Sequence, residues 1–120
     1  MDIIKQKGSE DDMMTEDEIK LAEIGKRITE RRKKLGLTQE ALAEKGDLTP
    51  QFVSYAEAGK RAMRPENVIK LANALEVSAD YLLTGDIVVK DLLILSEKLR
   101  TLSPEMLRIV ENIIDECSKL

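Results

Sequence analysis

Residues 36–59, with the sequence GLTQEALAEKGDLTPQFVSYAEAG, decide the fold of this chain. Thr38 predicts the start of a short helix, because its hydroxyl can accept a hydrogen bond from a free main-chain amide in the first turn. Thr49 followed by Pro50 predicts a second start, with the proline at the first helical position, where its missing N–H does no harm. Residues 46–48 interrupt the apolar pattern. The stretch therefore predicts two short helices joined by a tight turn.

Further helical patterns lie on both sides of this stretch. Thr15 and Glu18 have the spacing of a capping box, and apolar residues follow at intervals of three, four and seven. Gly25 costs this first helix about 1 kcal/mol relative to alanine, so we expect its ordered part to begin nearer Glu23 than Thr15. The patterns predict helices over residues 15–35, 39–45, 50–58, 65–75, 79–83, 90–102 and 104–120. The expected fold class is all-α.

Composition narrows the function classes. The 120 residues are 42% apolar but include only two tyrosines and one phenylalanine, so the core is expected to be aliphatic and helical. One cysteine and no histidine exclude an internal disulfide and disfavour zinc sites and histidine-based catalysis. No apolar run has the length of a membrane span or a signal peptide. We expect a cytoplasmic protein that is not an enzyme, needs no cofactor or metal, and does not contact membranes.

Charge is distributed unevenly along the chain. The net charge of −4 divides into −4 for residues 1–22, +2 for residues 23–85 and −2 for residues 86–120. In the middle segment the basic residues fall in two clusters, as a phosphate-facing surface requires, although solvated helix faces would give the same composition. Residues 1–14 are acidic and aperiodic and predict a flexible tail.

The chain resembles the Xre/Cro-type, phage-repressor-like helix-turn-helix regulators over residues 23–85. The segments that carry the resemblance are IGKRI at 24–28, GLTQEALAEK at 36–45, VS at 53–54, EAGKR at 57–61, PEN at 65–67, LANAL at 71–75 and SADYLLTG at 78–85. Each segment alone is a weak signal, but the ordered set at family spacing is a strong one. The resemblance implies a five-helix DNA-binding domain in a transcriptional regulator. The apolar pattern of residues 86–120, outside the resemblance, predicts a C-terminal helical hairpin after it.

Three positions depart from the family pattern. Asp47 stands at a turn position usually held by glycine, and aspartate tolerates the left-handed conformation better than most residues. Pro50 replaces a polar side chain that often contacts DNA, so one base contact is expected to be lost. Ala56 replaces a larger apolar residue, which predicts looser packing behind the second short helix unless Phe52 or Met63 fills the space.

The N-terminal, outward positions of that second helix are the ones that enter the major groove in such a motif. They predict base contacts by Thr49, Gln51, Ser54 and Tyr55. Gln51 is the best candidate, because its amide can bond an adenine edge through two hydrogen bonds. For Tyr55 the alternatives are a phosphate, a sugar or thymine methyl, or simple packing on the basic loop.

Phosphate contacts are expected from polar and basic residues around this helix. They are Thr38, Gln39, Lys34, Lys60, Arg61 and Arg64. Gln39 resembles the family's phosphate clamp, Thr38 is alternatively only a cap, and Arg32 is an alternative to Lys34. Glu57 is assigned to structure, paired with an arginine such as Arg27 or Arg31, because a carboxylate near phosphate is repelled.

The C-terminal helices carry a broad apolar stripe, which predicts either an intramolecular hairpin or, as we favour, a dimer interface. The expected interface residues are Leu92, Leu95, Leu99, Met106, Val110, Ile113, Ile114 and Cys117. Residues 86–120 are thus a predicted dimerisation segment after a DNA-binding domain of residues 15–85. The predicted partner is double-stranded DNA, bound by a homodimer at an inverted repeat, with repression as the family's commonest mode.

A second function class keeps the same fold but acts through protein. An antitoxin or anti-repressor module of this kind fits the acidic tail and the negative net charge. A protein antagonist or co-regulator is then a further expected partner. Loss of DNA binding at low salt would distinguish this class from a DNA-binding regulator.

Overall fold

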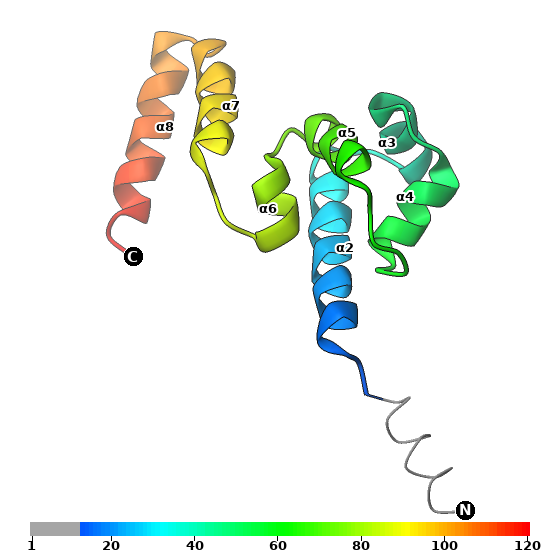
Figure 1. Ribbon diagram of the computed structural model, residues 1–120. Coiled ribbons are helices and arrows are strands. Elements are labelled where there is room, and N and C mark those ends of the chain that lie inside the picture. The colour runs from blue at the N-terminus through cyan, green and yellow to red at the C-terminus, as the bar shows by residue number, and fades with distance from the viewer. Residues whose placement is uncertain (1–12) are drawn as a thin grey trace, which may run out of the picture.

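The computed structural model describes residues 13–120. In this part of the chain the helices are joined by turns and loops, and there is no strand (Figure 1). Its helices are α2 (Glu16–Lys34), α3 (Gln39–Gly46), α4 (Pro50–Glu57), α5 (Pro65–Leu75), α6 (Ala79–Thr84), α7 (Val89–Arg100) and α8 (Pro104–Cys117). The all-α prediction is confirmed. The expected tail of residues 1–14 lies, except for its last two residues, outside the described residues.

Helix α2 begins at Glu16, so the expectation of a start nearer Glu23 was wrong. The predicted capping box is present: Thr15 Oγ1 accepts from the Glu18 amide at 3.2 Å, and Glu18 accepts in return from the Thr15 amide at 3.4 Å. These two hydrogen bonds, with acidic residues in the first turn, stabilise the helix start enough to offset the propensity cost of Gly25.

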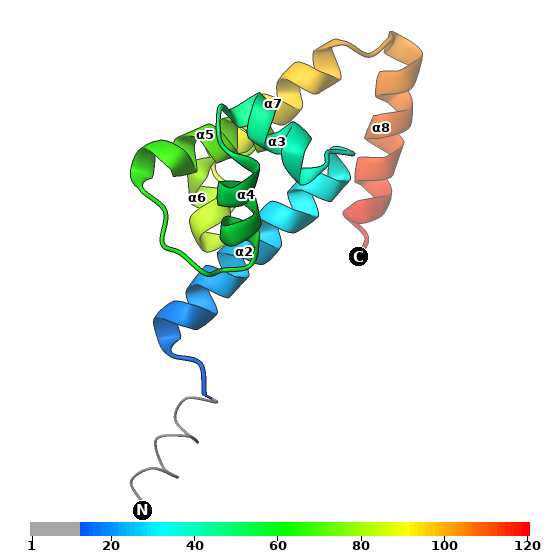
Figure 2. The same cartoon turned by 90° about the vertical axis from the view of Figure 1, so that its right-hand side faces the viewer.

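The core is formed where five helices meet. Helices α2 to α6, which we call the five-helix unit, pack around one aliphatic cluster, and α2 runs along the whole unit (Figures 1 and 2). The fully buried large side chains of this cluster are Ile28, Leu42, Val53, Leu71, Leu75 and Leu82. Phe52 and Met63 are half-buried against this cluster, which also contains Ala56.

The turns follow the local rules of the sequence. Thr38 and Thr49 cap α3 and α4 through their hydroxyls, as predicted. Asp47 has the left-handed conformation, with φ of 55°, and ends α3. The Leu48 amide then donates to the Ala43 carbonyl at 2.8 Å, which turns the chain toward α4. Aspartate therefore adopts at this turn the left-handed conformation that glycine usually adopts.

Helices α7 and α8, which we call the C-terminal pair, extend away from the five-helix unit (Figure 1). Figure 2 shows that they leave their connecting turn at an open angle. Neither helix contains a buried residue. The two helices therefore do not cover each other's apolar side chains. Among residues 13–120, no helix combines the length and the apolar character that crossing a membrane requires.

Candidate nucleic-acid interface

The N-terminal half of α4 presents its side chains to solvent. Thr49, Gln51 and Ser54 are exposed, whereas Val53 and Ala56 on the opposite side are buried in the core. Thr49 Oγ1 accepts from the Phe52 amide at 3.1 Å, so its hydroxyl is engaged in capping. The helix thus has an inner face that packs against the core and an outer face that exposes polar side chains to solvent.

Gln51 and Tyr55, one turn apart on α4, are joined by a hydrogen bond. Gln51 Nε2 donates to the Tyr55 hydroxyl oxygen at 3.0 Å. The guanidinium of Arg61, in the loop after α4, lies 5.3 Å from the centre of the Tyr55 ring, within the range of a cation–π contact. Tyr55 therefore packs on the basic loop, which is one of the alternatives that the sequence left open, and it also holds the amide of Gln51.

The carboxylate of Glu57, at the end of α4, joins three helices. It accepts from Arg32 Nε of α2 at 2.6 Å and from Gln39 Nε2 of α3 at 3.2 Å. Thr29 Oγ1 of α2 lies 3.0 Å from the same carboxylate and also 3.0 Å from the Gly25 carbonyl, so its single proton can serve only one of them. The side chains of Arg32 and Glu57 are only 13% and 7% exposed. This network fixes α4 relative to α2 and α3.

The pKa of the Glu57 carboxyl lies below its ordinary value. Burial raises this pKa, but the hydrogen bonds from Arg32, Gln39 and Thr29, together with the positive charge of Arg32, outweigh burial. The hydrogen bond with Glu57 likewise raises the pKa of Arg32. Both groups are therefore charged at neutral pH, and their attraction stabilises the folded protein.

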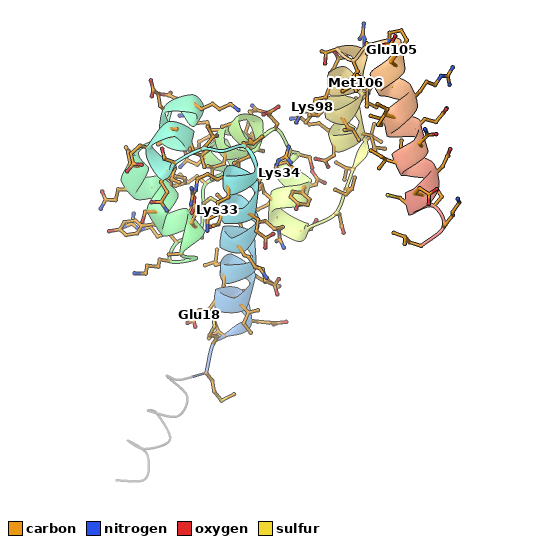
Figure 3. All side chains as sticks on the ribbon, turned by 180° about the vertical axis from the view of Figure 1, so that it is seen from behind. Glu18, Lys33, Lys34, Lys98, Glu105 and Met106 are labelled. Atoms are coloured by element: carbon orange, nitrogen blue, oxygen red, sulfur yellow. The ribbon has the colours of Figure 1, made fainter. Side chains whose placement is uncertain are left out.

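Basic side chains lie in the loop that follows α4 and at the C-terminal end of α2. Lys34, Lys60, Arg61 and Arg64 are exposed, and none of them forms an ion pair with another residue in the range 13–120. Figure 3 shows Lys34 at the C-terminal end of α2. Lys34 is nine residues after Gly25, so it lies on the side of α2 away from α4, where it lines a pocket with Arg31 and Asp91. Thr38 is exposed and caps α3, and Gln39 is half-buried against Glu57. Arg32, the alternative to Lys34, is committed to Glu57 and to the Leu37 carbonyl, so it is not available to phosphate.

Comparison with known proteins gives the family. A family model described as helix-turn-helix matches residues 28–82. Repressor protein C2 of Salmonella phage P22 is 39% identical over 64 residues, which make up 53% of this chain and 30% of the repressor. The HTH-type transcriptional regulator ImmR of Bacillus subtilis (strain 168) is 40% identical over 67 residues, which make up 56% of this chain and 53% of ImmR.

Two solved structures extend this result. The P22 c2 repressor in complex with synthetic operator 9T has a TM-score of 0.51 at 40% identity, covering 52% of this chain and 96% of that chain. The restriction-modification controller protein C.AhdI from Aeromonas hydrophila has a TM-score of 0.50 at 37% identity, covering 52% and 94%. The chain belongs to the Xre-type, phage-repressor-like helix-turn-helix family. It spans 30% and 53% of the lengths of repressor C2 and ImmR.

Within this helix-turn-helix unit, the expected partner of Glu57 was wrong. Arg27 and Arg31 point to the other side of α2: Arg27 donates to the Leu82 carbonyl at 2.9 Å and Arg31 to the Leu75 carbonyl at 2.9 Å. These carbonyls lie near the C-terminal ends of α6 and α5, where main-chain acceptors lack helical partners. A helix turns by 100° per residue, so Arg32 shares the α4-facing side with Thr29 and Gly25, and Arg27 and Arg31 do not.

The residues that the sequence reasoning missed are Gly25 and Thr29 in this helix-turn-helix unit and Asp91 of α7, which accepts a hydrogen bond from the Ser78 amide. Gly25 was read only as a helix-weakening residue, whereas it is buried beneath α4. A glycine in the interior of a long helix is the sequence signal that indicates such a close approach. Thr29 gave no signal, because its role depends on the position of Glu57 in space.

The residues predicted for the dimer interface all lie on the C-terminal pair. Leu92, Leu95, Met106, Ile113, Ile114 and Cys117 are exposed, and Leu99 and Val110 are half-buried. Figure 3 shows Met106 close to the turn between α7 and α8. Ile109 and Leu120 extend the exposed apolar surface along α8. A large apolar surface of this kind is costly in water and marks a site of association.

Proposed function

We propose that this protein is a sequence-specific DNA-binding transcriptional regulator that acts as a homodimer, binds an inverted-repeat operator and represses transcription. The observation that carries the proposal is the outer face of α4, where Gln51 and Ser54 are exposed beside basic residues without ion pairs among residues 13–120. The similar P22 repressor was solved with a synthetic operator. In this proposal residues 15–85 form the DNA-binding domain, which works in the cytoplasm on double-stranded DNA.

The base contacts are assigned to the exposed half of α4. Gln51 has an amide that can bond an adenine edge, and Tyr55 holds this amide at 3.0 Å from its hydroxyl oxygen. Ser54 and Thr49 lie on the same outer face, and Thr49 acts through its methyl group because its hydroxyl caps α4. Pro50 brings no polar group to the groove, so discrimination is concentrated on Gln51.

The phosphate contacts are assigned to basic and polar groups around the helix-turn-helix. Lys60, Arg61 and Arg64 come from the loop that follows α4, whereas Lys34 lies on the side of α2 away from α4 and is the most distant of the proposed contacts. The N-terminus of α3, with Thr38 and Gln39, adds main-chain amides and the positive end of a helix dipole. Clustering of the positive charge here explains how a chain of net charge −4 can bind DNA.

Dimerisation is assigned to residues 86–120. The C-terminal pair exposes apolar side chains along both helices, and the two helices leave their connecting turn at an open angle (Figure 2). A second copy offers the same surface, and a two-fold pair presents two copies of α4 to half-sites about one helical turn apart.

Matched variants on the two classes of contact test the proposal. Operators are first selected from random DNA, and binding is then measured across a salt series. Gln51→Ala is expected to lower preference at one position per half-site by about 1–3 kcal/mol, whereas Lys60→Ala weakens all sequences alike and reduces the salt slope by about 1. Glu44→Ala, an exposed change elsewhere on α3, is the control. Absence of DNA binding at low salt would overturn the proposal.

The second candidate function is a module that acts through protein, as an antitoxin or anti-repressor does. The exposed apolar surface of the C-terminal pair favours it, because a different protein can cover this surface instead of a second copy. Light scattering and the DNA-binding assay together separate the candidates. A protein that is monomeric at micromolar concentration and binds no DNA supports the second candidate. A protein antagonist or co-regulator is compatible with both.

A further inference from the structure

The carboxylate of Asp91, near the start of α7, lies at the junction between the five-helix unit and the C-terminal pair. Its Oδ1 accepts from the Ser78 amide at 2.8 Å. Its Oδ2 accepts from Ser78 Oγ at 2.8 Å and from the Val88 amide at 3.0 Å. One side chain of α7 therefore binds both the start of its own helix and the residue before α6. We call this set of contacts the Asp91 clamp.

Ser78, on the other side of the clamp, belongs to the rigid core. It is only 2% exposed. Its Oγ donates to Asp91 and accepts from the Tyr81 amide at 2.9 Å, so the same hydroxyl caps α6. The clamp thus ties α7 to a buried position of the five-helix unit and not to a surface side chain. Charged acceptors of several hydrogen bonds form the stronger class of polar contacts.

Two weaker contacts lie near the clamp. Lys98 of α7 pairs with Glu76 at 3.5 Å, and Lys90 donates to Asn73 Oδ1 at 3.4 Å. Both are solvent-exposed, and exposed pairs of this kind contribute little. Burial raises the pKa of the Asp91 carboxyl, but the hydrogen bonds from Val88 and Ser78 outweigh burial and keep this pKa below its ordinary value. Asp91 is therefore ionised at neutral pH, as the clamp requires.

The link between α6 and α7 is short. Residues 85–88 connect the two helices, and Gly85 takes the left-handed conformation with φ of 84°. Without a fixed point, the main-chain torsions of such a link would let α7 leave in several directions. The Asp91 clamp removes this freedom at the first turn of α7.

We propose that Asp91 is a specificity-determining residue for operator geometry: its clamp on Ser78 sets the spacing between the half-sites that the dimer accepts. The inference rests on the proposed function, because spacing matters only to a dimer that reads two half-sites. If the C-terminal pairs associate and each α7 leaves its five-helix unit in one direction, the two α4 helices are held at one separation. A loose junction would let them reach several separations.

Two substitutions test this role, each of which removes one carboxylate at the junction between α6 and α7. Asp91→Ala removes the clamp, and Asp86→Ala is the matched control, because no hydrogen bond to its carboxylate is found among residues 13–120. Asp91→Asn keeps one acceptor oxygen and is the milder variant if Asp91→Ala does not fold. Binding is measured on duplexes that carry the selected half-sites at several separations.

The wild type and Asp86→Ala are expected to bind one spacing at least about tenfold more tightly than spacings about two base pairs longer or shorter. For Asp91→Ala this ratio falls to about threefold or less, with unchanged affinity for a single half-site. An unchanged spacing preference in Asp91→Ala overturns the inference and leaves the proposed function standing. If the wild type binds no paired half-sites, the proposed function fails and the inference with it.

A measurement without DNA gives a second readout. Spin labels at Glu44→Cys and Glu97→Cys, in a Cys117→Ser background diluted with unlabelled protein, report the distance between α3 and α7 within one chain. A narrow distance distribution is expected for the wild type and Asp86→Ala, and a broad one for Asp91→Ala. Equal widths in all three proteins would overturn the role of the clamp.

Discussion

Gly25 of α2 lies against the main-chain carbonyl of Ala56 in α4: a Cβ on this glycine would stand 2.7 Å from the carbonyl oxygen. The same Cβ would also clash with the carbonyl oxygen of Glu57. Gly59 makes a similar close approach to α2, since a Cβ on it would lie 2.9 Å from the Ala22 Cα. The backbone of α2 therefore touches the C-terminal end of α4 at Gly25 and the residue just beyond that helix, Gly59, at Ala22. No side chain can move aside to make room there.

Gly25→Ala is expected to destabilise the protein by about 1–3 kcal/mol, because the added methyl group forces the two backbones apart. Helix propensity alone predicts the opposite, a gain of about 1 kcal/mol. Urea unfolding followed by circular dichroism decides between them, with Glu23→Ala, an exposed change on the same helix, as the control. A stabilised Gly25→Ala protein would contradict the close approach.

Glu57→Gln is expected to cost about 3 kcal/mol of stability, because it leaves the guanidinium of Arg32 buried without its counter-charge. Glu111→Gln, whose carboxylate pairs with Arg108 on the surface, is the matched control and should change stability by less than about 0.5 kcal/mol. Urea titrations at neutral pH measure both. Similar losses in the two variants would show that the Glu57 network does not hold α4.

Acid is expected to weaken the wild type through the same carboxylate. The folded-state pKa of Glu57 lies below its ordinary value of 4.5, so its contribution is complete above that pH and is lost as the pH falls through the lower, folded pKa. Glu76 and Asp91 have lowered pKa values and act in the same direction. Glu57→Gln should therefore show a shallower loss of stability on acidification than the wild type in urea titrations below pH 4.5. Parallel curves would argue against this assignment.

Tyr55→Phe is expected to reduce discrimination at the base read by Gln51 by about threefold, because the amide loses the hydroxyl that holds it. The ring and its contact with Arg61 remain, so affinity for non-specific DNA should not change. Competition between the selected operator and single-base variants measures the effect. If non-specific affinity fell and discrimination did not, Tyr55 would be a backbone contact instead.

Ile113→Asp is expected to convert the dimer to a monomer, because it places a charge in the apolar surface of α8. Ile69→Asp on α5 is a closely matched control: the two isoleucines are 56% and 54% exposed, and only Ile113 belongs to the C-terminal pair. Sedimentation of both variants gives the oligomeric state. A dimeric Ile113→Asp protein, or a monomeric Ile69→Asp protein, would place the interface elsewhere.

Local features of this fold could be predicted from the sequence, and contacts between distant residues could not. Thr15, Thr38, Thr49 and Ser78 begin helices because a side-chain hydroxyl acts on amides only a few residues away. Asp47 takes the left-handed turn for an equally local reason. Such features are encoded within a few residues.

The partner of Glu57 is different, since three arginines of α2 lie within six residues and only the rotation of the helix selects Arg32. The Asp91 clamp joins residues thirteen apart through a link whose direction no local pattern specifies. Of the candidate site, the exposed residues of α4 follow from helix periodicity. The hydrogen bond between Gln51 and Tyr55 adds a detail that depends on side-chain rotamers.

The two faces of α4 also bear on how such a regulator can evolve. The contacts that anchor this helix come from its inner side and its C-terminal end, through residues that include Phe52, Val53, Ala56 and Glu57. Gln51 and Ser54 take no part in that anchoring. Under the proposed function, mutations at these two residues change what is recognised without the loss of stability that would remove the protein from a population, so new operator preferences are accessible by single substitutions.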